Sequence, residues 1–246
     1  MIELRDIQKY YIEKRRVRGG ERIYAINNIS AKFSDGNVYA IFGNSGSGKT
    51  TLGSMISGYV QPDSGEIYYD NSRIRTKKSV RHVFQDPYAS LNGAKDVAWH
   101  IETTAGLNDL DEENVWKVYE NSGLSREDYR NRLVWTLSGG EKQILAFSMA
   151  LAQKPSCIVL DEPFSFLDTM TLCRELNLIK QTRDKILYIY LDNDMNRCVY
   201  VSDFIHVMKE GKIIESGSTE SVISSPENDF TRQIIENMPD IEKRIG

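Results

Sequence analysis

A glycine-rich segment, residues 43–51, constrains the fold of this chain more than any other part of the sequence. It follows the apolar run Val38–Phe42, an order that predicts a strand, a loop and a helix. Its spacing, G-x-x-x-x-G-K-[ST], lets the glycines adopt backbone angles that other residues avoid, so that successive N–H groups can point at phosphate oxygens. We therefore expect a phosphate-binding loop and not merely a flexible glycine-serine loop.

The residues of this loop have the chemistry needed to bind a nucleoside triphosphate. Lys49 brings a mobile positive charge to the outer phosphates, and the Thr50 hydroxyl can bind Mg²⁺. The helix that begins there presents the positive end of its dipole to the anion. The predicted nucleotide-binding residues are Gly43, Asn44, Ser45, Gly46, Ser47, Gly48, Lys49, Thr50 and Thr51.

The composition narrows the class of protein further. With 246 residues, 40% of them hydrophobic, the chain can form one large α/β domain or a domain with an insertion. The net charge of -4 is spread without long basic blocks, which argues against a nucleic-acid partner. Three widely spaced cysteines indicate reduced, structural thiols. No signal pattern or long apolar run is present, so we expect a cytosolic protein.

Strand-like and helix-like runs alternate along the rest of the chain. We expect a hairpin of strands 2–4 and 24–33 joined by the charged segment 13–21. The segment 96–121 has helical spacing with a break at 106–109, so 86–136 is predicted to be an inserted helical subdomain. Further strands are expected at 66–69, 79–84, 157–161, 186–191, 204–208 and 212–215, helices at 51–59, 142–152 and 170–183, and then a polar tail that ends in a charged helix.

Two aromatic residues and two acidic residues outside the loop are further candidates. Tyr10 and Tyr11 end the first strand and could cover the core or stack on a flat ligand such as adenine; the residues alone favour the core. Asp161 and Glu162 follow an apolar strand, where adjacent carboxylates suit metal and proton chemistry near a phosphate loop. Ser138 precedes two glycines and a helix, which indicates a second phosphate contact or an ordinary helix cap.

The order of these motifs resembles the nucleotide-binding subunits of ATP-binding-cassette (ABC) transporters over nearly the whole chain. Residues 43–50 correspond to the Walker A loop, Gln85 to the Q-loop glutamine, and 137–141 to the signature motif. Asp161 and Glu162 correspond to the Walker B aspartate and the catalytic acid, and 165–168 to the D-loop. Within the family, residues 84–92 and 225–239 look like the cassettes of oligopeptide, dipeptide and nickel importers.

The resemblance implies a P-loop NTPase fold of the α/β class. Such a fold has a RecA-like parallel sheet core, an antiparallel β subdomain and an inserted α-helical subdomain. The whole chain, 1–246, would be one ABC ATPase domain. Its core and β subdomain would comprise 1–85 and 137–224, its helical subdomain 86–136, and its tail 225–246.

The resemblance also implies a mechanism in which two cassettes close face to face and each ATP lies between one Walker A loop and the other signature motif. Glu162 would polarise the attacking water, and Tyr11, rather than Tyr10, would stack on adenine. The implied catalytic residues are Glu162, Lys49, Gln85 and Asn193; the implied Mg²⁺ ligands are Thr50, Gln85 and Asp161; the implied further nucleotide contacts are Ser138, Gly139, Gly140, Glu141 and Asp168.

The chain departs from the family pattern at two places. Asn193 stands where a switch histidine is expected, and Ile144 and Met149 stand where importers of this kind place arginines. These changes remove cationic hydrogen-bond donors. We therefore expect this subunit to work in an asymmetric pair, with a different cassette that supplies the histidine at the second ATP site.

The implied partners are that second cassette, two membrane permease subunits and, indirectly, an extracytoplasmic solute-binding protein. The chain would lie on the inner face of the cell membrane and power uptake of a peptide-, nickel- or metal-complex-type solute. Two alternatives stay open: a regulatory cassette that binds ATP but hydrolyses it weakly, and a non-transport ABC protein of the DNA-repair type. Proteins of the latter type carry coiled coils or zinc modules inserted between the motifs, whereas the segment 85–137 is short and shows neither.

Overall fold

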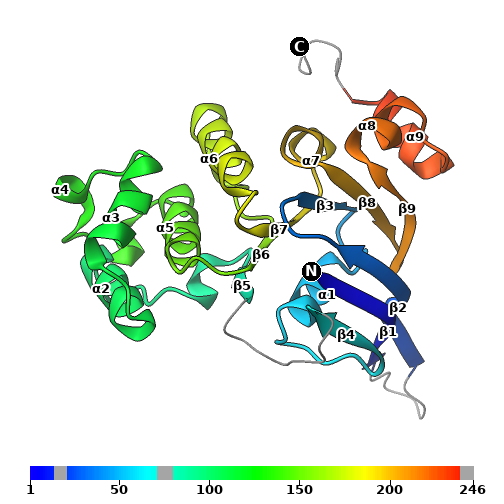
Figure 1. Ribbon diagram of the computed structural model, residues 1–246, viewed down its shortest axis with the longest axis horizontal. Coiled ribbons are helices and arrows are strands. Elements are labelled where there is room, and N and C mark those ends of the chain that lie inside the picture. Colours follow the sequence, from blue (N-terminus) through cyan, green and yellow to red (C-terminus); the bar gives the residue numbers. More distant parts are fainter. Residues whose placement is uncertain (14–20, 71–79, 239–246) are drawn as a thin grey trace.

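The computed structural model describes residues 1–13, 21–70 and 80–238, which form two sheets and a group of helices to one side of them (Figure 1). Most of the charged segment predicted to join the first two strands lies outside the described residues, as do the last eight residues of the tail. The arrangement confirms the predicted α/β class with an antiparallel β part and inserted helices.

The larger sheet has six strands in the order β5-β6-β7-β3-β8-β9. All neighbours are parallel except β9, which runs antiparallel to β8. Every residue of β3, β6 and β7 is buried, which explains their continuous apolar runs. The strands are β3 (Val38–Phe42), β5 (Val80–Val83), β6 (Cys157–Asp161), β7 (Leu187–Asp192), β8 (Phe204–Lys209) and β9 (Lys212–Ser218).

The smaller sheet is antiparallel and has the order β2-β1-β4. Its strands are β1 (Ile2–Glu13), β2 (Glu21–Phe33) and β4 (Ser64–Tyr69). The first strand is much longer than the predicted 2–4, because β1 pairs with β2 along its length despite charged residues and several register shifts. Ile7, in the middle of β1, is fully buried and fixes the strand to the core.

Helices cover both faces of the larger sheet. On one face α1 (Lys49–Ile56) packs between the two sheets, in one core with side chains of β1, β2, β3, β6 and β7. The other face packs against α5 (Gly139–Ala152), α6 (Thr169–Thr182) and α7 (Met195–Val201). The helix predicted at 142–152 therefore begins three residues earlier, because the side chain of Ser138 caps it at that point.

The inserted helices lie at one end of the molecule, beyond β5 (Figure 1). They are α2 (Val97–Asn108), α3 (Glu112–Asn121) and α4 (Arg126–Tyr129), flanked by the short 3₁₀ helices Pro87–Ala89 and Val134–Thr136. The predicted break at 106–109 begins too early, because the helix continues to Asn108. The helix α2 runs through the exposed Gly106, which costs a helix only about 1 kcal/mol, and it ends at the left-handed Asp109.

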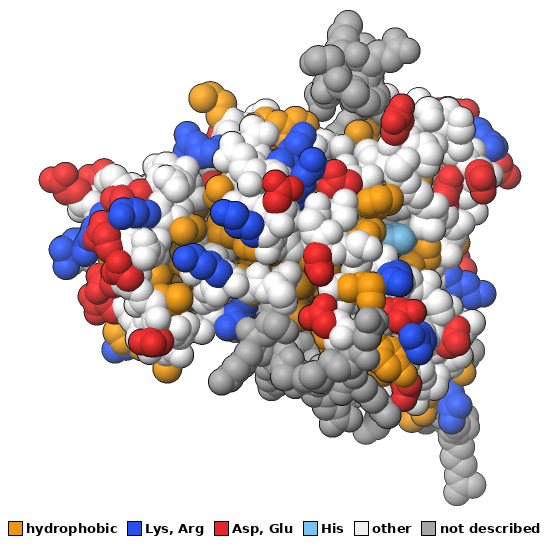
Figure 2. Space-filling view, in the orientation of Figure 1, with side chains coloured by type: hydrophobic (Ala, Val, Ile, Leu, Met, Phe, Trp, Pro, Cys, Tyr) orange, Lys and Arg blue, Asp and Glu red, His pale blue; other side chains and the backbone are white. Residues whose placement is uncertain are grey.

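Two short helices, α8 (Thr219–Ser224) and α9 (Asp229–Glu236), follow β9. None of the helices in the described part of the chain is long and apolar enough to cross a membrane. Acidic and basic side chains are mixed over the face of the molecule shown in Figure 2.

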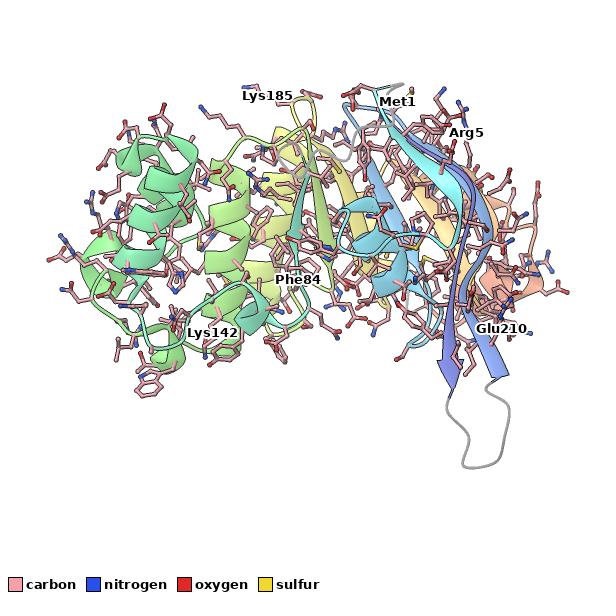
Figure 3. The ribbon with its side chains drawn as sticks, turned by 90° about the horizontal axis from the view of Figure 1, so that it is seen from below. Met1, Arg5, Phe84, Lys142, Lys185 and Glu210 are labelled. Carbon is pink, nitrogen blue, oxygen red and sulfur yellow. The ribbon has the colours of Figure 1, made fainter. Side chains whose placement is uncertain are left out.

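The parallel strands give the larger sheet two chemically different edges. In Figure 3, Phe84, which directly follows β5, lies toward the lower edge with Lys142 and Glu210, whereas Lys185, which precedes β7, lies at the upper edge with Met1. The lower edge is therefore the carboxyl edge of the sheet, where binding sites of open α/β folds are built.

Candidate functional site

The glycine-rich loop between β3 and α1 has the backbone geometry that its spacing predicts. Gly46 and Gly48 have positive φ angles of 79° and 104°, which favour glycine. A Cβ atom on Gly48 would lie 2.3 Å from the Ala25 carbonyl oxygen of β2, and one on Gly43 would lie 2.5 Å from the Met208 carbonyl oxygen of β8. Neighbouring backbone therefore closes on the loop so tightly that side chains are excluded at both glycines.

Lys49 is held inside this loop. Its ammonium donates hydrogen bonds to the carbonyl oxygens of Gly43, at 2.6 Å, and Asn44, at 3.3 Å. The side chain is buried, as is that of Ser47, whose hydroxyl has no hydrogen-bond partner among the described residues. Asn44, Ser45, Gly46 and Ser47 line one side of a cavity of about 200 Å³. A cation and an unpaired hydroxyl inside a cradle of backbone fit a polyphosphate.

Thr50 and Asp161 come together at the carboxyl edge. Asp161 ends β6 and is buried, and one of its carboxylate oxygens lacks a hydrogen-bond partner within the described residues. Burial raises the pKa of Asp161 to about 6; Glu162 and Asp192 add to the rise, while a hydrogen bond from Thr50 and the charge of Lys49 oppose it. A hydroxyl and an unpaired carboxylate oxygen are suitable ligands for Mg²⁺.

These two residues would bind a metal only together with other ligands. The described part of the chain contains no cluster of three or more His, Cys, Asp or Glu side chains that could hold a metal ion. A Mg²⁺ ion that uses few protein ligands takes the rest from phosphate oxygens and water. The composition of the site therefore suits a metal that arrives with a nucleotide.

Glu162 and Gln85 also meet at this edge. The Gln85 side-chain amide donates a hydrogen bond of 3.0 Å to the Glu162 carboxylate, although 77 residues separate them. Glu162 has a positive φ of 42°, and its N–H donates to the Leu191 carbonyl of β7 at 2.9 Å. A non-glycine residue held in the left-handed region is strained, and such strain clusters at functional positions.

The second glycine pair lies elsewhere on the same chain. Ser138 caps α5 in a reciprocal capping box with Glu141, and Glu141 also accepts a hydrogen bond of 2.7 Å from the Tyr129 hydroxyl. Asp168 caps α6 by accepting from the N–H groups of Met170 and Thr171. Ser138, Gly140, Glu141 and Asp168 line a cavity of about 280 Å³, while Gly139 lies beside Phe166. None of them lines the cavity of the glycine-rich loop.

Asn193 is exposed at the end of β7 and shares a third cavity, of about 480 Å³, with Asn44 of the glycine-rich loop. The same cavity is lined by Arg197, whose guanidinium forms a 2.8 Å ion pair with the buried carboxylate of Asp192. Sequence reasoning missed Arg197. The available signal was a lone arginine five residues after a strand-end aspartate, inside a short and otherwise uncharged helical segment.

The two candidate tyrosines have different surroundings. The Tyr10 ring packs against Tyr24 of β2, with ring centroids 6.0 Å apart, and the Arg22 guanidinium lies 4.6 Å from its centroid. Tyr11 is half exposed, and its recorded ring contact is the Lys9 ammonium at 5.8 Å. Tyr10 is paired with Tyr24 of β2, and the carbonyl oxygen of the next residue, Ala25, lies against Gly48. Tyr10 is therefore next to the part of β2 that contacts the loop.

Comparison with known proteins gives one consistent result. Residues 26–165 match the family model described as ABC transporter. The dipeptide transport ATP-binding protein DppF of Lactococcus lactis is 33% identical over 87% of this chain and 75% of its own length. DppF of Haemophilus influenzae is 29% identical over 97% and 78%, and the oligopeptide transport ATP-binding protein AmiF of Streptococcus pneumoniae is 29% identical over 97% and 82%.

Solved structures agree in fold. The dimeric post-hydrolysis state of the ATP-binding cassette MJ0796, bound to ADP and Pi, superposes with a TM-score of 0.78 at 24% identity over 89% of this chain and 99% of that chain. The structure of cbiO1 from Clostridium perfringens, part of the ABC transporter complex cbiONQ, gives 0.74 at 26% identity over 99% and 98%.

Proposed function

The chain belongs to the ABC transporter family, and from this membership we propose that it is the ATP-binding and ATP-hydrolysing subunit of an importer. The single observation that carries the proposal is the meeting of two residue pairs beside the glycine-rich loop. Thr50 contacts Asp161, and Gln85 contacts Glu162, at one edge of the sheet. Phosphate binding, metal binding and water activation then fall within one site.

The glycine-rich loop would hold the phosphates of ATP. Its backbone N–H groups and the Lys49 ammonium are suited to neutralise and orient the outer phosphates. Lys49 now bonds to carbonyl oxygens of its own loop, and it would exchange those bonds for phosphate oxygens. Thr50 and Asp161 would hold Mg²⁺, which when bound neutralises charge between the outer phosphates. Gln85, which donates a hydrogen bond to the neighbouring Glu162, can provide a further ligand to the metal.

Glu162 would act on the attacking water. A carboxylate next to the metal-binding Asp161 can accept a proton from water or orient it toward the terminal phosphate. The hydrogen bond from Gln85 and the N–H bond to Leu191 hold Glu162 in place. Because Gln85 begins the segment that leads into the inserted helices, movement of those helices would be transmitted to Glu162.

Hydrolysis would require a second cassette. Ser138, Gly140, Glu141 and Asp168 line a different cavity from the glycine-rich loop, so each chain offers two half-sites. In a face-to-face pair, the Ser138–Glu141 motif and Asp168 of one chain would close over the nucleotide on the loop of the other. Residues 1–85 with 137–224, and 86–136, would then move as two parts of the single domain, with 225–246 as a tail.

For the adenine contact we favour Tyr10 over the sequence-based choice of Tyr11. Tyr10 packs on Tyr24, next to the β2 residue that closes on Gly48, whereas Tyr11 is half exposed beside Lys9. An aromatic ring near the inner end of a phosphate loop can stack on a purine base.

The solute and the other partners follow from the relatives. DppF is named for dipeptide transport and AmiF for oligopeptide transport, which favours a peptide over nickel or a metal complex. The chain would work with two membrane permease subunits on the inner, cytoplasmic face of the membrane, and an extracytoplasmic solute-binding protein would deliver the solute to them. No part of this scheme calls for a nucleic acid.

A second candidate, a cassette that binds ATP but turns it over slowly, is favoured by Asn193. Asparagine is neutral and shorter than the histidine expected there, so it gives weaker stabilisation of the charge on a transferring phosphoryl group. We therefore propose a heterodimer in which the site on this glycine-rich loop is the slower one. A different cassette would carry the histidine at the other site.

The test is single-turnover hydrolysis in the assembled complex. The partner cassette carries an alanine in place of its own phosphate-loop lysine, so that ATP binds only at this chain's loop. We predict that Glu162→Gln, which keeps the side chain's shape, leaves ATP affinity unchanged and lowers the rate about a hundredfold or more. Asp86→Asn, in the same segment as Gln85 but outside these pairs, is the matched control. Unchanged hydrolysis in Glu162→Gln would refute the role of Glu162.

A further inference from the structure

Arg197 is a cation at the carboxyl edge that the proposed mechanism leaves unused. It lies in α7, four residues after Asn193, and only 18% of its side chain is exposed. Its guanidinium donates a 2.8 Å hydrogen bond to the Asp192 carboxylate. An arginine in a largely buried position, one helical turn from the place of the missing histidine, needs an explanation beyond surface solubility.

The ion pair with Asp192 does not use up the guanidinium. The bond to Asp192 is the hydrogen bond that the described structure records for Arg197. Its buried Nε atom has no hydrogen-bond partner there and forms a longer ion pair, of 3.7 Å, with the Asp194 carboxylate. An arginine offers five N–H donors. Asp192 depends less on the pair, because it also accepts hydrogen bonds from the Tyr190 hydroxyl and the Asp194 N–H, both at 2.9 Å. The guanidinium can therefore turn toward another anion while Asp192 keeps two donors.

The pair also lies at the outer-phosphate end of the glycine-rich loop. The backbone N–H of Gly43 donates to the Asp192 carbonyl oxygen at 3.3 Å. Asn44, the next residue, shares the 480 Å³ cavity with Asn193 and Arg197, and its carbonyl oxygen accepts a hydrogen bond from Lys49. Because Lys49 serves the outer phosphates, this cavity adjoins the place where the terminal phosphate of ATP would lie.

We propose that Arg197 supplies, from α7, the positive charge for the terminal phosphate that Asn193 cannot supply from the loop. The planar guanidinium forms paired hydrogen bonds with phosphate oxygens and stays charged at all relevant pH values. Because ADP lacks the terminal phosphate, this contact favours binding of ATP over ADP. Part of the guanidinium charge is balanced by Asp192 and Asp194, so Arg197 does not give the full rate of a histidine. This inference rests on the proposed function, since it assigns a residue to the same nucleotide site.

The test compares fluorescent analogues of ATP and ADP in equilibrium titrations of the purified chain. Arg197→Gln is expected to weaken binding of the ATP analogue about tenfold and to leave binding of the ADP analogue unchanged. Asp192→Asn, which removes the shorter of the two ion pairs of the guanidinium, is expected to keep or raise the ATP preference. The control is Arg183→Gln, which breaks an Arg–Asp pair of 2.5 Å near the opposite edge of the sheet, and it should change neither affinity.

A purely structural ion pair predicts a different pattern. Arg197→Gln and Asp192→Asn would then weaken both nucleotides alike, or neither, and either result overturns the proposal. If Arg197→Gln fails to fold because it strands a buried carboxylate, the double variant Asp192→Asn/Arg197→Gln removes both charges and must still lose the ATP preference. Adding Asn193→His to the double variant should restore it. Failure of the wild-type chain to bind either analogue would instead refute the proposed function.

Discussion

Three carboxylates meet at the carboxyl edge of the larger sheet, and each has a different hydrogen-bond donor. Asp161 accepts a hydrogen bond from Thr50, Glu162 accepts one from Gln85, and Asp192 pairs with Arg197. Three uncompensated charges so close together would repel one another and oppose binding of a polyphosphate. These donors therefore lower the repulsion that would oppose the anion binding proposed for this edge.

Residue spacing could predict the loop and the acid pair, because their partners lie within a few positions along the chain or follow strands that end together. It could not predict the Asp192–Arg197 pair or the different surroundings of Tyr10 and Tyr11. The first depends on how α7 folds back over β7, and the second on a register shift between β1 and β2 at Lys9 and Tyr10. Both are consequences of tertiary packing.

His206 gives a prediction about pH. It is buried in β8 against Phe33 and Tyr39, neither of its ring nitrogens has a hydrogen-bond partner among the described residues, and burial lowers its pKa to about 4. The pKa in the unfolded chain is about 6.5, so the unfolded state binds more protons between these values. The stability from His206 is thus complete above pH 6.5 and is lost as the pH falls toward 4.

Replacing His206 by phenylalanine, which is similar in shape and lacks unpaired nitrogens, should remove this loss. We expect the free energy of unfolding of His206→Phe, relative to that of wild type, to be about 2 kcal/mol higher at pH 5 than at pH 7. Urea unfolding at the two pH values measures this difference. Groups with raised pKa values, such as Glu175, give stability the opposite pH dependence, but both proteins contain them, so their contribution cancels in the comparison. An equal fall in stability for both proteins would contradict the assignment.

At the scale of elements, local signals and tertiary contacts determined different boundaries. The start of α5 is a local matter, because Ser138 and Glu141 form a capping box within one turn. The length of β1 is not, because charged residues such as Arg5 and Asp6 hide its strand character until β2 and β4 pair with it on both sides. Helix α2 passes through Gly106 because Ala105 before it and Leu110 after it pack in the same core as the other inserted helices.

The glycine-rich loop is an element whose shape depends on two neighbouring strands. Gly48 and Gly58 both have positive φ angles, but only a Cβ on Gly48 would strike backbone, the Ala25 carbonyl oxygen at 2.3 Å. Gly48→Ala should therefore lose ATP-analogue binding by about tenfold or more, through displacement of the loop from β2. Gly58→Ala carries a similar backbone cost of about 1–2 kcal/mol and should keep its affinity. Similar affinities for the two variants would show that β2 does not shape the loop.

At the scale of the whole molecule, the two cavities support the proposal that one chain supplies only part of each ATP site. The glycine-rich loop and the Ser138 motif lie in separate cavities, and we propose that the neutral Asn193 makes the site on this loop the slower one. We predict that Asn193→His raises single-turnover hydrolysis at this site by about tenfold or more, measured in the complex whose partner cassette cannot bind ATP. A rate that does not change would remove the reason for proposing an asymmetric pair.

The most direct test of the account is whether ATP binds on the glycine-rich loop through Lys49. Isothermal titration of the purified chain with ATP and Mg²⁺ should show saturable binding of one nucleotide per chain. Lys49→Ala should weaken that binding by about tenfold or more, while its thermal unfolding in the absence of nucleotide stays close to that of wild type. Binding of unchanged affinity in folded Lys49→Ala, or no binding by the wild-type chain, would contradict the central claim.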